Sequence, residues 1–211
     1  MVDFIDDPYG RFLAREPFMG TETLRLSDEG RDLLDQAKLK RAEKKLKQAL
    51  RICPFAVPAR NNLSLVYYLR KDYAKAVEEA KKTLDYYPEH TFAHCTLAMC
   101  FVKLRDSDRA KAHLDRAIHT YSRGTDPGEY LDKIVEALGV LGDDERIYEL
   151  YSKEEEHKFD PLSLFRIGVA SANLGKFDEA AQVWDESCLL GPSLRFLEVY
   201  KRAAGLQAQG K

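Results

Sequence analysis

His90, His94 and Cys95 are the residues whose types and spacing could bind a metal ion. The two histidines are four residues apart, so a helix would place them on one face, and the thiol of Cys95 follows directly. Zinc sites are built from four ligands of this kind, and the neighbouring sequence supplies no fourth. We therefore expect these side chains to pack or to contact solvent, and we predict no metal site.

The chain contains four cysteines, at positions 53, 95, 100 and 188. No two of them form a C-x-x-C pair, and each lies inside a helical pattern or at a helix end. This distribution is typical of reduced, packed thiols in a reducing compartment. We predict no disulfide.

Motifs of catalytic sites are missing from the sequence. It contains no G-x-S-x-G, no glycine-rich phosphate loop and no H-E-x-x-H, and no cysteine and histidine form the pattern of an activated nucleophile. Acidic residues are plentiful, but paired carboxylates are common on solvated helix surfaces. We therefore expect a protein that is not an enzyme and that needs no cofactor.

A pattern of small, apolar and aromatic residues recurs along the chain at an interval of 34 residues. Gly30, Ser64 and Ala98 are spaced by this interval. The same interval relates three further sets: Leu33, Tyr67 and Phe101; Ala42, Ala76 and Ala110; and Ala49, Thr83 and Ala117. Apolar residues at helical spacing within a repeat of this length predict two amphipathic helices per unit.

These units resemble the tetratricopeptide repeat (TPR). The last copy matches the family pattern best, through Leu164, Ile167, Gly168, Leu174, Gly175, Lys176, Phe177, Ala180, Trp184 and Pro192. Trp184 occupies the large-residue site of the second helix, so we expect it in the core rather than in an aromatic ligand site. The resemblance implies an all-α fold, a right-handed α-α superhelix of about five helical hairpins with a capping helix at its C-terminal end.

The fourth unit is degenerate, because it lacks the small residues and the proline of the others. Its apolar stripe consists of Leu131, Ile134, Leu138, Leu141, Ile147 and Tyr151. The predicted division of the chain is an N-terminal segment at 1–22, repeats at 23–56, 57–90, 91–124, 125–160 and 161–194, and a capping helix and tail at 195–211.

The N-terminal segment 1–22 is apolar but interrupted by Pro8, Gly10, Pro17 and Gly20. It is too interrupted for one long helix and too apolar for a typical disordered tail. We predict that it folds against the stack, either as a cap of the first repeat or as an intramolecular ligand.

The formal net charge of −2 gives no general reason to expect nucleic acid or a membrane as partner. Locally, the second helix of the first repeat is basic, through Lys38, Lys40, Arg41, Lys44, Lys45, Lys47 and Arg51. The fourth repeat is acidic, through Asp143, Asp144, Glu145, Glu149, Glu154, Glu155 and Glu156. Both sets are either solvated helix faces or surfaces that contact a partner or a second copy. Neither a membrane span nor a secretory signal is recognisable, so we expect a cytoplasmic protein.

In this family the first helices of successive repeats line a concave groove that binds a peptide, and the resemblance implies the same here. The groove positions carried over from the family are Asn61, Asn62, Leu65, Tyr68 and Leu69 in the second repeat, and Phe92, Cys95, Thr96, Met99, Val102 and Lys103 in the third. A mainly apolar groove favours an amphipathic or hydrophobic segment of another protein. Large exposed apolar patches are rare on monomers, so coverage by the protein's own chain stays open.

Two classes of function follow. The first is an adaptor or scaffold that binds a protein or peptide in the groove, and it is compatible with a regulatory subunit of an enzyme encoded elsewhere. The second is a structural module that forms homo-oligomers through its charged repeats or its groove. The sequence does not identify the partner, because fold resemblance does not transfer a pathway.

Overall fold

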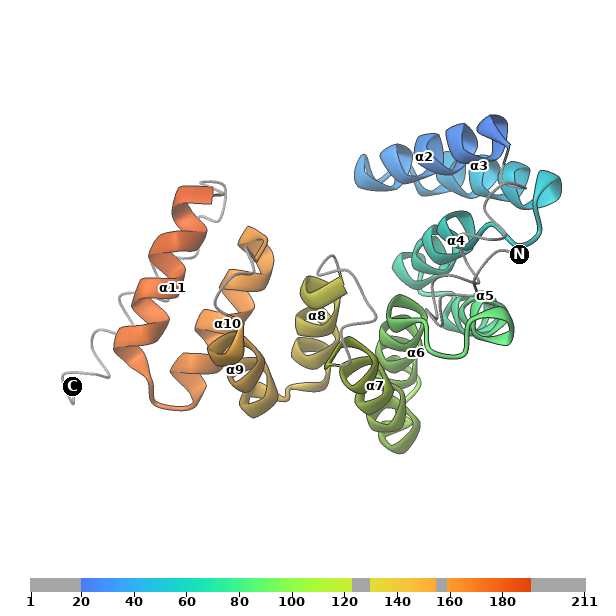
Figure 1. The fold of residues 1–211 in the computed structure, drawn as a ribbon. Coiled ribbons are helices and arrows are strands. Elements are labelled where there is room, and N and C mark those ends of the chain that lie inside the picture. The colour runs from blue at the N-terminus through green and yellow to red at the C-terminus, as the bar shows by residue number, and fades with distance from the viewer. Residues whose placement is uncertain (1–19, 123–129, 155–158, 191–211) are drawn as a thin grey trace, which may run out of the picture. The chain divides into compact units, whose positions relative to one another are not determined.

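A computed structural model describes residues 20–122, 130–154 and 159–190. These ranges contain ten helices and no strand, which confirms the predicted all-α class (Figure 1). The predicted capping helix at 195–211 and nearly all of the N-terminal segment lie outside the described residues. The helices are α2 (Thr21–Asp35), α3 (Leu39–Ile52), α4 (Val57–Leu69), α5 (Tyr73–Tyr86), α6 (Thr91–Lys103), α7 (Ser107–Ser122), α8 (Leu131–Leu141), α9 (Asp144–Lys153), α10 (Pro161–Asn173) and α11 (Phe177–Leu190).

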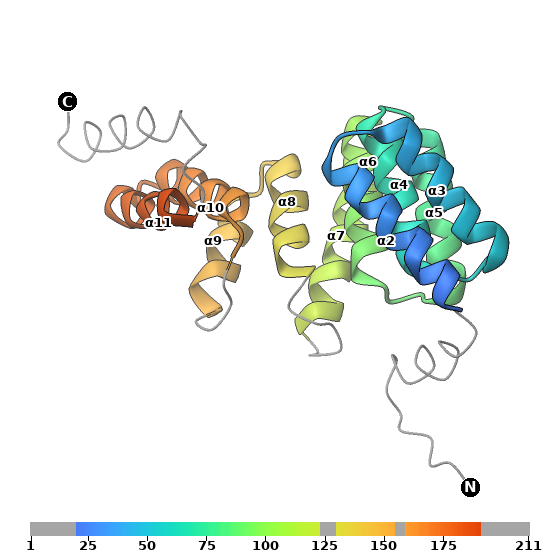
Figure 2. The ribbon, with the colours of Figure 1, turned by 90° about the horizontal axis from the view of Figure 1, so that it is seen from above.

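The helices divide between two units, Met1–Pro127 and Gly128–Lys211. In the first unit the hairpins are α2 with α3, α4 with α5 and α6 with α7. Helix α4 packs against both α2 and α6, so the first helices of the three hairpins form one row (Figure 2). This stacking of hairpins against sequence neighbours is the packing expected of a helical repeat protein.

The turn inside each hairpin of the first unit has the same backbone conformation. Ala37, Lys71 and Arg105 are 34 residues apart, and all three adopt a left-handed conformation with φ between 55° and 63°. At the second turn the N–H groups of Lys71 and Asp72 donate to the carbonyl oxygens of Tyr68 and Tyr67, both at 2.9 Å. This pair of bonds is a Schellman motif, which satisfies carbonyl groups that the end of a helix would leave unpaired.

Close helix approach depends on glycine residues of the repeat pattern. A Cβ added at Gly30 would lie 2.6 Å from Cγ of Leu46, which is fully buried. The corresponding pair in the last hairpin is Gly168 with Trp184. Substitution of either glycine therefore forces the facing side chain to move.

One buried cluster runs through the first two hairpins and reaches α6. It consists of Leu26, Leu34, Ala42, Leu46, Ala49, Cys53, Ala56, Ala59, Leu63, Val66, Tyr67, Ala76 and Cys100. At its edge the carboxylate of Glu43 accepts hydrogen bonds from Tyr67 and Arg70 of the next hairpin, the first at 3.2 Å. The hairpins are thus joined by apolar burial and by polar contacts at the rim.

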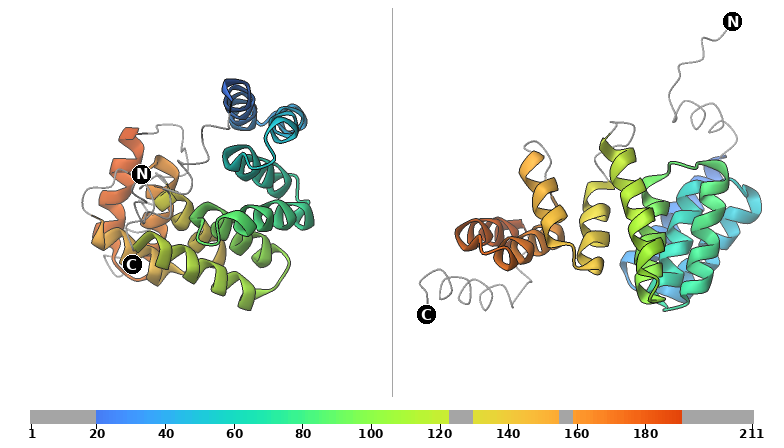
Figure 3. Two further views of the ribbon diagram at one scale, coloured as in Figure 1. Left: turned by 45° about the vertical axis from the view of Figure 1, so that its right-hand side comes forward. Right: turned by 90° about the horizontal axis from the view of Figure 1, so that it is seen from below.

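In the second unit, α8 and α9 both pack against α10, which pairs with α11 (Figure 3). The predicted stripe of the degenerate repeat faces inward at Leu131, Ile134, Leu138 and Ile147, which are buried, while Leu141 and Tyr151 are partly exposed. None of the described helices is long and apolar enough to cross a bilayer.

Asp160 and Pro161 form the cap at the start of α10. Asp160 accepts hydrogen bonds from the backbone N–H groups of Leu162 and Ser163, at 2.8 and 2.7 Å, and Pro161 fills the first turn. The backbone N–H of Asp160 also donates to the carboxylate of Asp132 on α8, at 3.0 Å. One aspartate therefore caps α10, and another links the start of α10 to α8.

Candidate binding surface

The predicted groove residues lie on two neighbouring helices, α4 and α6, whose packing is direct. Pro58 sits in the first turn of α4, and the ring of His90 caps α6 by accepting the N–H of Ala93 at 3.4 Å. Tyr68 and Leu69 of α4 are 34 residues before Val102 and Lys103 of α6. These four residues hold equivalent positions, so they fall on the same side of the row of first helices.

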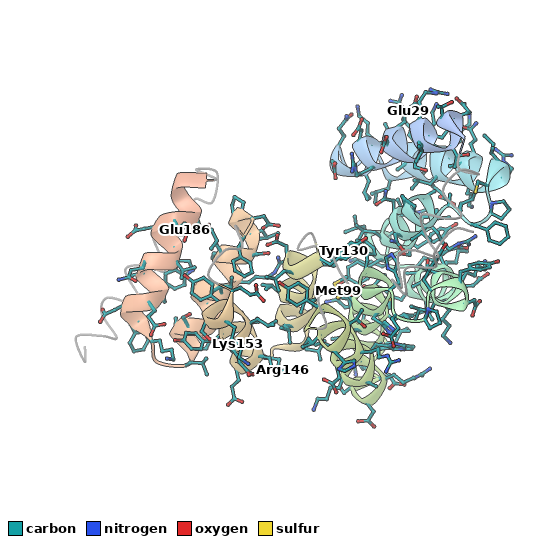
Figure 4. The ribbon with its side chains drawn as sticks, viewed as in Figure 1. Glu29, Met99, Tyr130, Arg146, Lys153 and Glu186 are labelled. Carbon is teal, nitrogen blue, oxygen red and sulfur yellow. The ribbon has the colours of Figure 1, made fainter. Side chains whose placement is uncertain are left out.

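Exposure divides the predicted set into three groups. Cys95, Thr96 and Met99 have no exposed surface, and Asn61 is 7% exposed; Figure 4 labels Met99 on α6. Asn62, Leu65, Tyr68, Phe92 and Val102 are partly exposed. Leu69, at 49%, and Lys103 are exposed. The accessible part of the set is therefore a strip along one side of α4, with Phe92 at the start of α6 and Val102 and Lys103 at its end.

Two residues of this strip also belong to the fold. Leu65 and Tyr68 pack against the buried cluster of the first two hairpins. The Tyr68 ring lies 5.8 Å from the ring of Tyr73 on α5. Leu69 is not among the residues packed on that cluster, so it is the apolar side chain of the strip best placed to contact another molecule.

Asn61 holds α4 to α5 and to the start of α6. Its side-chain amide lies 3.4 Å from Oγ1 of Thr83 and 3.4 Å from Nε2 of His90. Because buried amides need hydrogen-bond partners, Asn61 in this position serves the packing of the hairpins. Burial lowers the pKa of His90 to about 4, so this ring is neutral at neutral pH.

A buried ion pair lies next to this network. Arg60 on α4 pairs with Glu79 on α5 at 2.7 Å, and the two side chains are only 11% and 13% exposed. The Arg60 guanidinium also donates to the carbonyl oxygen of Pro54, six residues earlier. The pair therefore joins both helices of the second hairpin to the preceding turn.

Sequence reasoning missed the corresponding contact in the third hairpin. Nε2 of His94 lies 2.9 Å from the carbonyl oxygen of Pro88, again six residues earlier, and Nδ1 lies 3.0 Å from Nδ1 of His113 on α7. Since a carbonyl only accepts, Nε2 of His94 carries a proton, and Nδ1 accepts from Nδ1–H of His113. The signal was available, because His94 and His113 are each 34 residues after Arg60 and Glu79.

The titration of the histidine pair follows from its burial and neighbours. Burial is the largest cause that lowers the pKa of His94, opposed by its bond to Pro88. Burial, the proximity of His94 and the cations Lys81 and Arg109 lower the pKa of His113 to about 4. Both rings are therefore neutral at pH 7.

Within the ranges that the structure describes, no group of three or more His, Cys, Asp or Glu side chains is arranged to hold a metal ion. Cys53, Cys95 and Cys100 are free, buried thiols. The side chain of Cys188 lies outside the described set.

Family models of the tetratricopeptide repeat match residues 27–90 and residues 96–123. The chain therefore contains tetratricopeptide repeats over these residues. Together the matches run from within α2 to the end of α7 with a gap at 91–95, so they cover α4 and the part of α6 from Thr96 onward. No curated protein matches the sequence of this TPR protein.

Solved structures of other TPR proteins share the fold. A thermophilic TPR protein of Thermus thermophilus is 17% identical, with a TM-score of 0.68 over 87% of this chain and 99% of that one. PilF of Pseudomonas aeruginosa is 19% identical, with a TM-score of 0.59 over 88% and 90%. YrrB, described as a TPR protein with an unusual peptide-binding site, is 18% identical, with a TM-score of 0.50 over 90% and 97%. At these identities the likeness concerns the fold alone.

Proposed function

We propose that this TPR protein is a non-catalytic adaptor that binds a peptide or amphipathic segment of another protein along the strip on α4 and α6. The observation that carries the proposal is Leu69, an apolar side chain 49% exposed beside the partly exposed Leu65 and Tyr68. Such a strip offers an apolar contact with a polar end at Lys103. The peptide-binding site of a protein of the same fold, YrrB, supports this interpretation.

The chemistry of the strip selects the kind of partner. Leucine and tyrosine side chains bury apolar area, and Tyr68 adds a hydroxyl group that can donate or accept a hydrogen bond. A helical partner would place apolar residues at i, i+3 or i+4, and i+7 on this strip. The side chains of Cys95, Thr96 and Met99 are buried, so they contribute to the packing of α6 and not to contact with the partner.

The test is affinity capture from the native cell with the full chain and two variants. Leu69→Asp places a charge in the strip, and we expect this variant to recover at least tenfold less of the partner than the unchanged protein does. Leu65→Asp is less informative, because Leu65 packs on the buried cluster and the change would disturb the fold.

The matched control is Leu104→Asp, because Leu104 is also 49% exposed but lies outside the predicted set. Helicity measured by circular dichroism should be the same for both variants. Recovery of the same proteins at the same level with Leu69→Asp as with Leu104→Asp would contradict binding along the strip.

A further inference from the structure

Helix α3 carries the highest positive charge of the described helices. Its 14 residues include six cationic side chains and one carboxylate, that of Glu43. The second helix of the next hairpin, α5, has three lysines balanced by three acidic residues. A terminal repeat needs a polar outer face to stay soluble, and positive or negative side chains serve this purpose equally well. The large excess of positive charge on α3 therefore needs another explanation.

Three of these cations form a stripe without a carboxylate partner among the described residues. Arg41, Lys44, Gln48 and Arg51 follow one another at spacings of three, four and three residues, so they lie on one side of α3. By contrast, Lys45 pairs with Glu29 on α2 at 2.7 Å. The stripe is about 15 Å long at the helical rise per residue.

Two adjoining hollows open along this side of the first hairpin. One, of about 290 Å³, is lined by Leu33, Arg41, Lys44, Lys45 and Gln48. The other, of about 450 Å³, is lined by Glu22, Arg25, Leu26, Lys45, Gln48, Arg51 and Ile52. Both share Lys45 and Gln48, and Ile52 is 56% exposed. The stripe therefore runs beside apolar surface into which a side chain can fit.

The two hollows lie at the open end of the row of described helices, while Lys44 and Arg51 also border a third hollow with Arg60, Leu63 and Glu79 of the next hairpin. Helices α2 and α3 pack against each other and against α4. Glu29, which pairs with Lys45, is labelled on α2 in Figure 4, on the side away from α4. Another element could therefore lie here without displacing a described helix.

We propose that this basic face, made of Arg41, Lys44, Gln48 and Arg51 with Leu33 and Ile52, docks an acidic amphipathic helix of a partner protein. Carboxylates spaced three and four residues apart would pair with the stripe, and apolar side chains would enter the hollows. Three turns of helix match the length of the stripe. This surface is distinct from the strip on α4 and α6, so a partner can occupy either one alone.

Nucleic acid fits this face less well than an acidic helix does. None of the described residues that line the hollows is aromatic, so a base has no ring to stack on. A phosphate backbone also has no apolar side chain that could enter the hollows. An acidic protein segment uses both the charge and the apolar surface.

A second copy of the chain also fits less well. Three of the five described carboxylates of the acidic repeat already have partners. Asp143 pairs with Arg146 at 2.7 Å, and Glu149 pairs with Lys153 at 2.5 Å. Asp144 accepts a hydrogen bond from Asn173 at 2.8 Å. A partner with free carboxylates would gain more from the stripe.

The probe is a synthetic 14-residue helical peptide with leucine at positions 1, 4, 8 and 11 and glutamate at the flanking positions. Binding to the full chain is measured by fluorescence anisotropy at low and at moderate salt. We expect saturable binding that weakens at least tenfold when the salt concentration rises from about 50 to about 300 mM, because exposed charges are screened. A peptide with serine for leucine should bind at least tenfold more weakly.

Charge reversal locates the site. We expect at least tenfold weaker affinity for the peptide in the triple variant Arg41→Glu, Lys44→Glu and Arg51→Glu. Changing the same three residues to glutamine should weaken the affinity by an intermediate amount. The control is Lys71→Glu, Lys81→Glu and Lys111→Glu, which reverses three exposed lysines in the second hairpin and on α7. Equal binding by the two charge-reversed variants would overturn the proposal.

Two other outcomes would overturn it as well. One is displacement of the peptide by a single-stranded oligonucleotide at lower concentration than by unlabelled peptide. The other is salt-sensitive self-association in sedimentation that only the α3 variant abolishes. The variant Leu69→Asp should bind the acidic peptide normally, which keeps this test independent of the adaptor strip.

Discussion

His94 and His113 contact each other through their Nδ1 atoms, 3.0 Å apart, at the positions that Arg60 and Glu79 hold one repeat earlier. The same site between two helices therefore carries an ion pair in the second hairpin and a neutral hydrogen-bonded pair in the third. The ion pair is largely removed from water, whereas in the histidine pair His94 is buried and His113 is half-buried. They differ in how they respond to protons, because the arginine keeps its charge at any ordinary pH and the histidines do not.

The first prediction concerns pH. The folded-state pKa values of His90 and His113 are lowered to about 4 from 6.5, so the unfolded chain binds more protons as the pH falls below 6.5. The stabilisation is complete above that pH and is lost progressively down to about pH 4. Protonation at the buried His90 should lower the free energy of unfolding by about 2 kcal/mol between pH 7 and pH 5. The half-buried His113 should contribute less, because solvent screens its charge.

Urea unfolding followed by circular dichroism at pH 7, 6 and 5 measures this effect. Groups of both signs face the pair, with Arg116 and Glu89 near His94, and Lys81 and Arg109 near His113. His90→Asn keeps a capping acceptor for α6 and should reduce the loss at pH 5. The control is His119→Asn, at an exposed histidine of α7. An unfolding free energy that stays constant from pH 7 to pH 5 would refute the prediction.

The second prediction concerns a variant in which the histidine pair of the third hairpin is replaced by the ion pair of the second hairpin. The double variant His94→Arg and His113→Glu should reproduce the pair formed by Arg60 and Glu79 and should show a smaller loss of stability at pH 5. The single variant His94→Arg leaves a buried charge without its opposite, so it should be destabilised by about 2 kcal/mol or more. The single variant His113→Glu should be destabilised less, because position 113 is half-buried. A double-mutant cycle measures the coupling, and the absence of favourable coupling would mean that the two sites are not equivalent.

The third prediction concerns Gly168 and Trp184. A Cβ at Gly168 would lie 2.5 Å from Cδ1 and 2.7 Å from Cε2 of the indole, which is held by a 3.2 Å hydrogen bond from Nε1 to the carbonyl oxygen of Phe165. Gly168→Ala should therefore destabilise the fold by about 2 kcal/mol through overpacking. The measurement is the thermal or urea-induced unfolding of the full chain.

A matched glycine and a compensating change make this prediction sharper. Gly139→Ala on α8 meets only the flexible side chain of Arg166, at 3.2 Å, so it should be neutral or stabilising by up to about 1 kcal/mol. Adding Trp184→Leu to Gly168→Ala should recover part of the loss, because it restores room between the helices. If the losses of stability from Gly168→Ala and Trp184→Leu simply add in the double variant, the two side chains do not compete for the same space between the helices.

Much of the fold could be predicted because the features that specify it are local. The spacing of small residues fixed which positions face a neighbouring helix, and Gly30 and Gly168 do contact large side chains. The stripe of the degenerate repeat was recognisable at Ile134 and Leu138 from apolar periodicity alone. Such signals depend on a helix and its next neighbour, so one sequence contains them.

The candidate binding surface was harder to predict, because exposure depends on everything that packs around a residue. Met99 and Leu69 both belong to the groove pattern of the family, yet Met99 is 0% exposed and Leu69 is 49% exposed. The contact between His94 and His113 was missed because each histidine alone looks like an ordinary packed or solvated residue. Only the interval that relates them to Arg60 and Glu79 marks them as a pair.

The left-handed turns at Ala37, Lys71 and Arg105 have a practical consequence for experiments on this protein. A methyl, an ammonium and a guanidinium group occupy the same backbone conformation and are all exposed, so these corners tolerate unrelated chemistry. Cysteines engineered there would offer three equivalent attachment points for dyes or spin labels, one per hairpin, from which distances along the first unit could be read while a ligand binds.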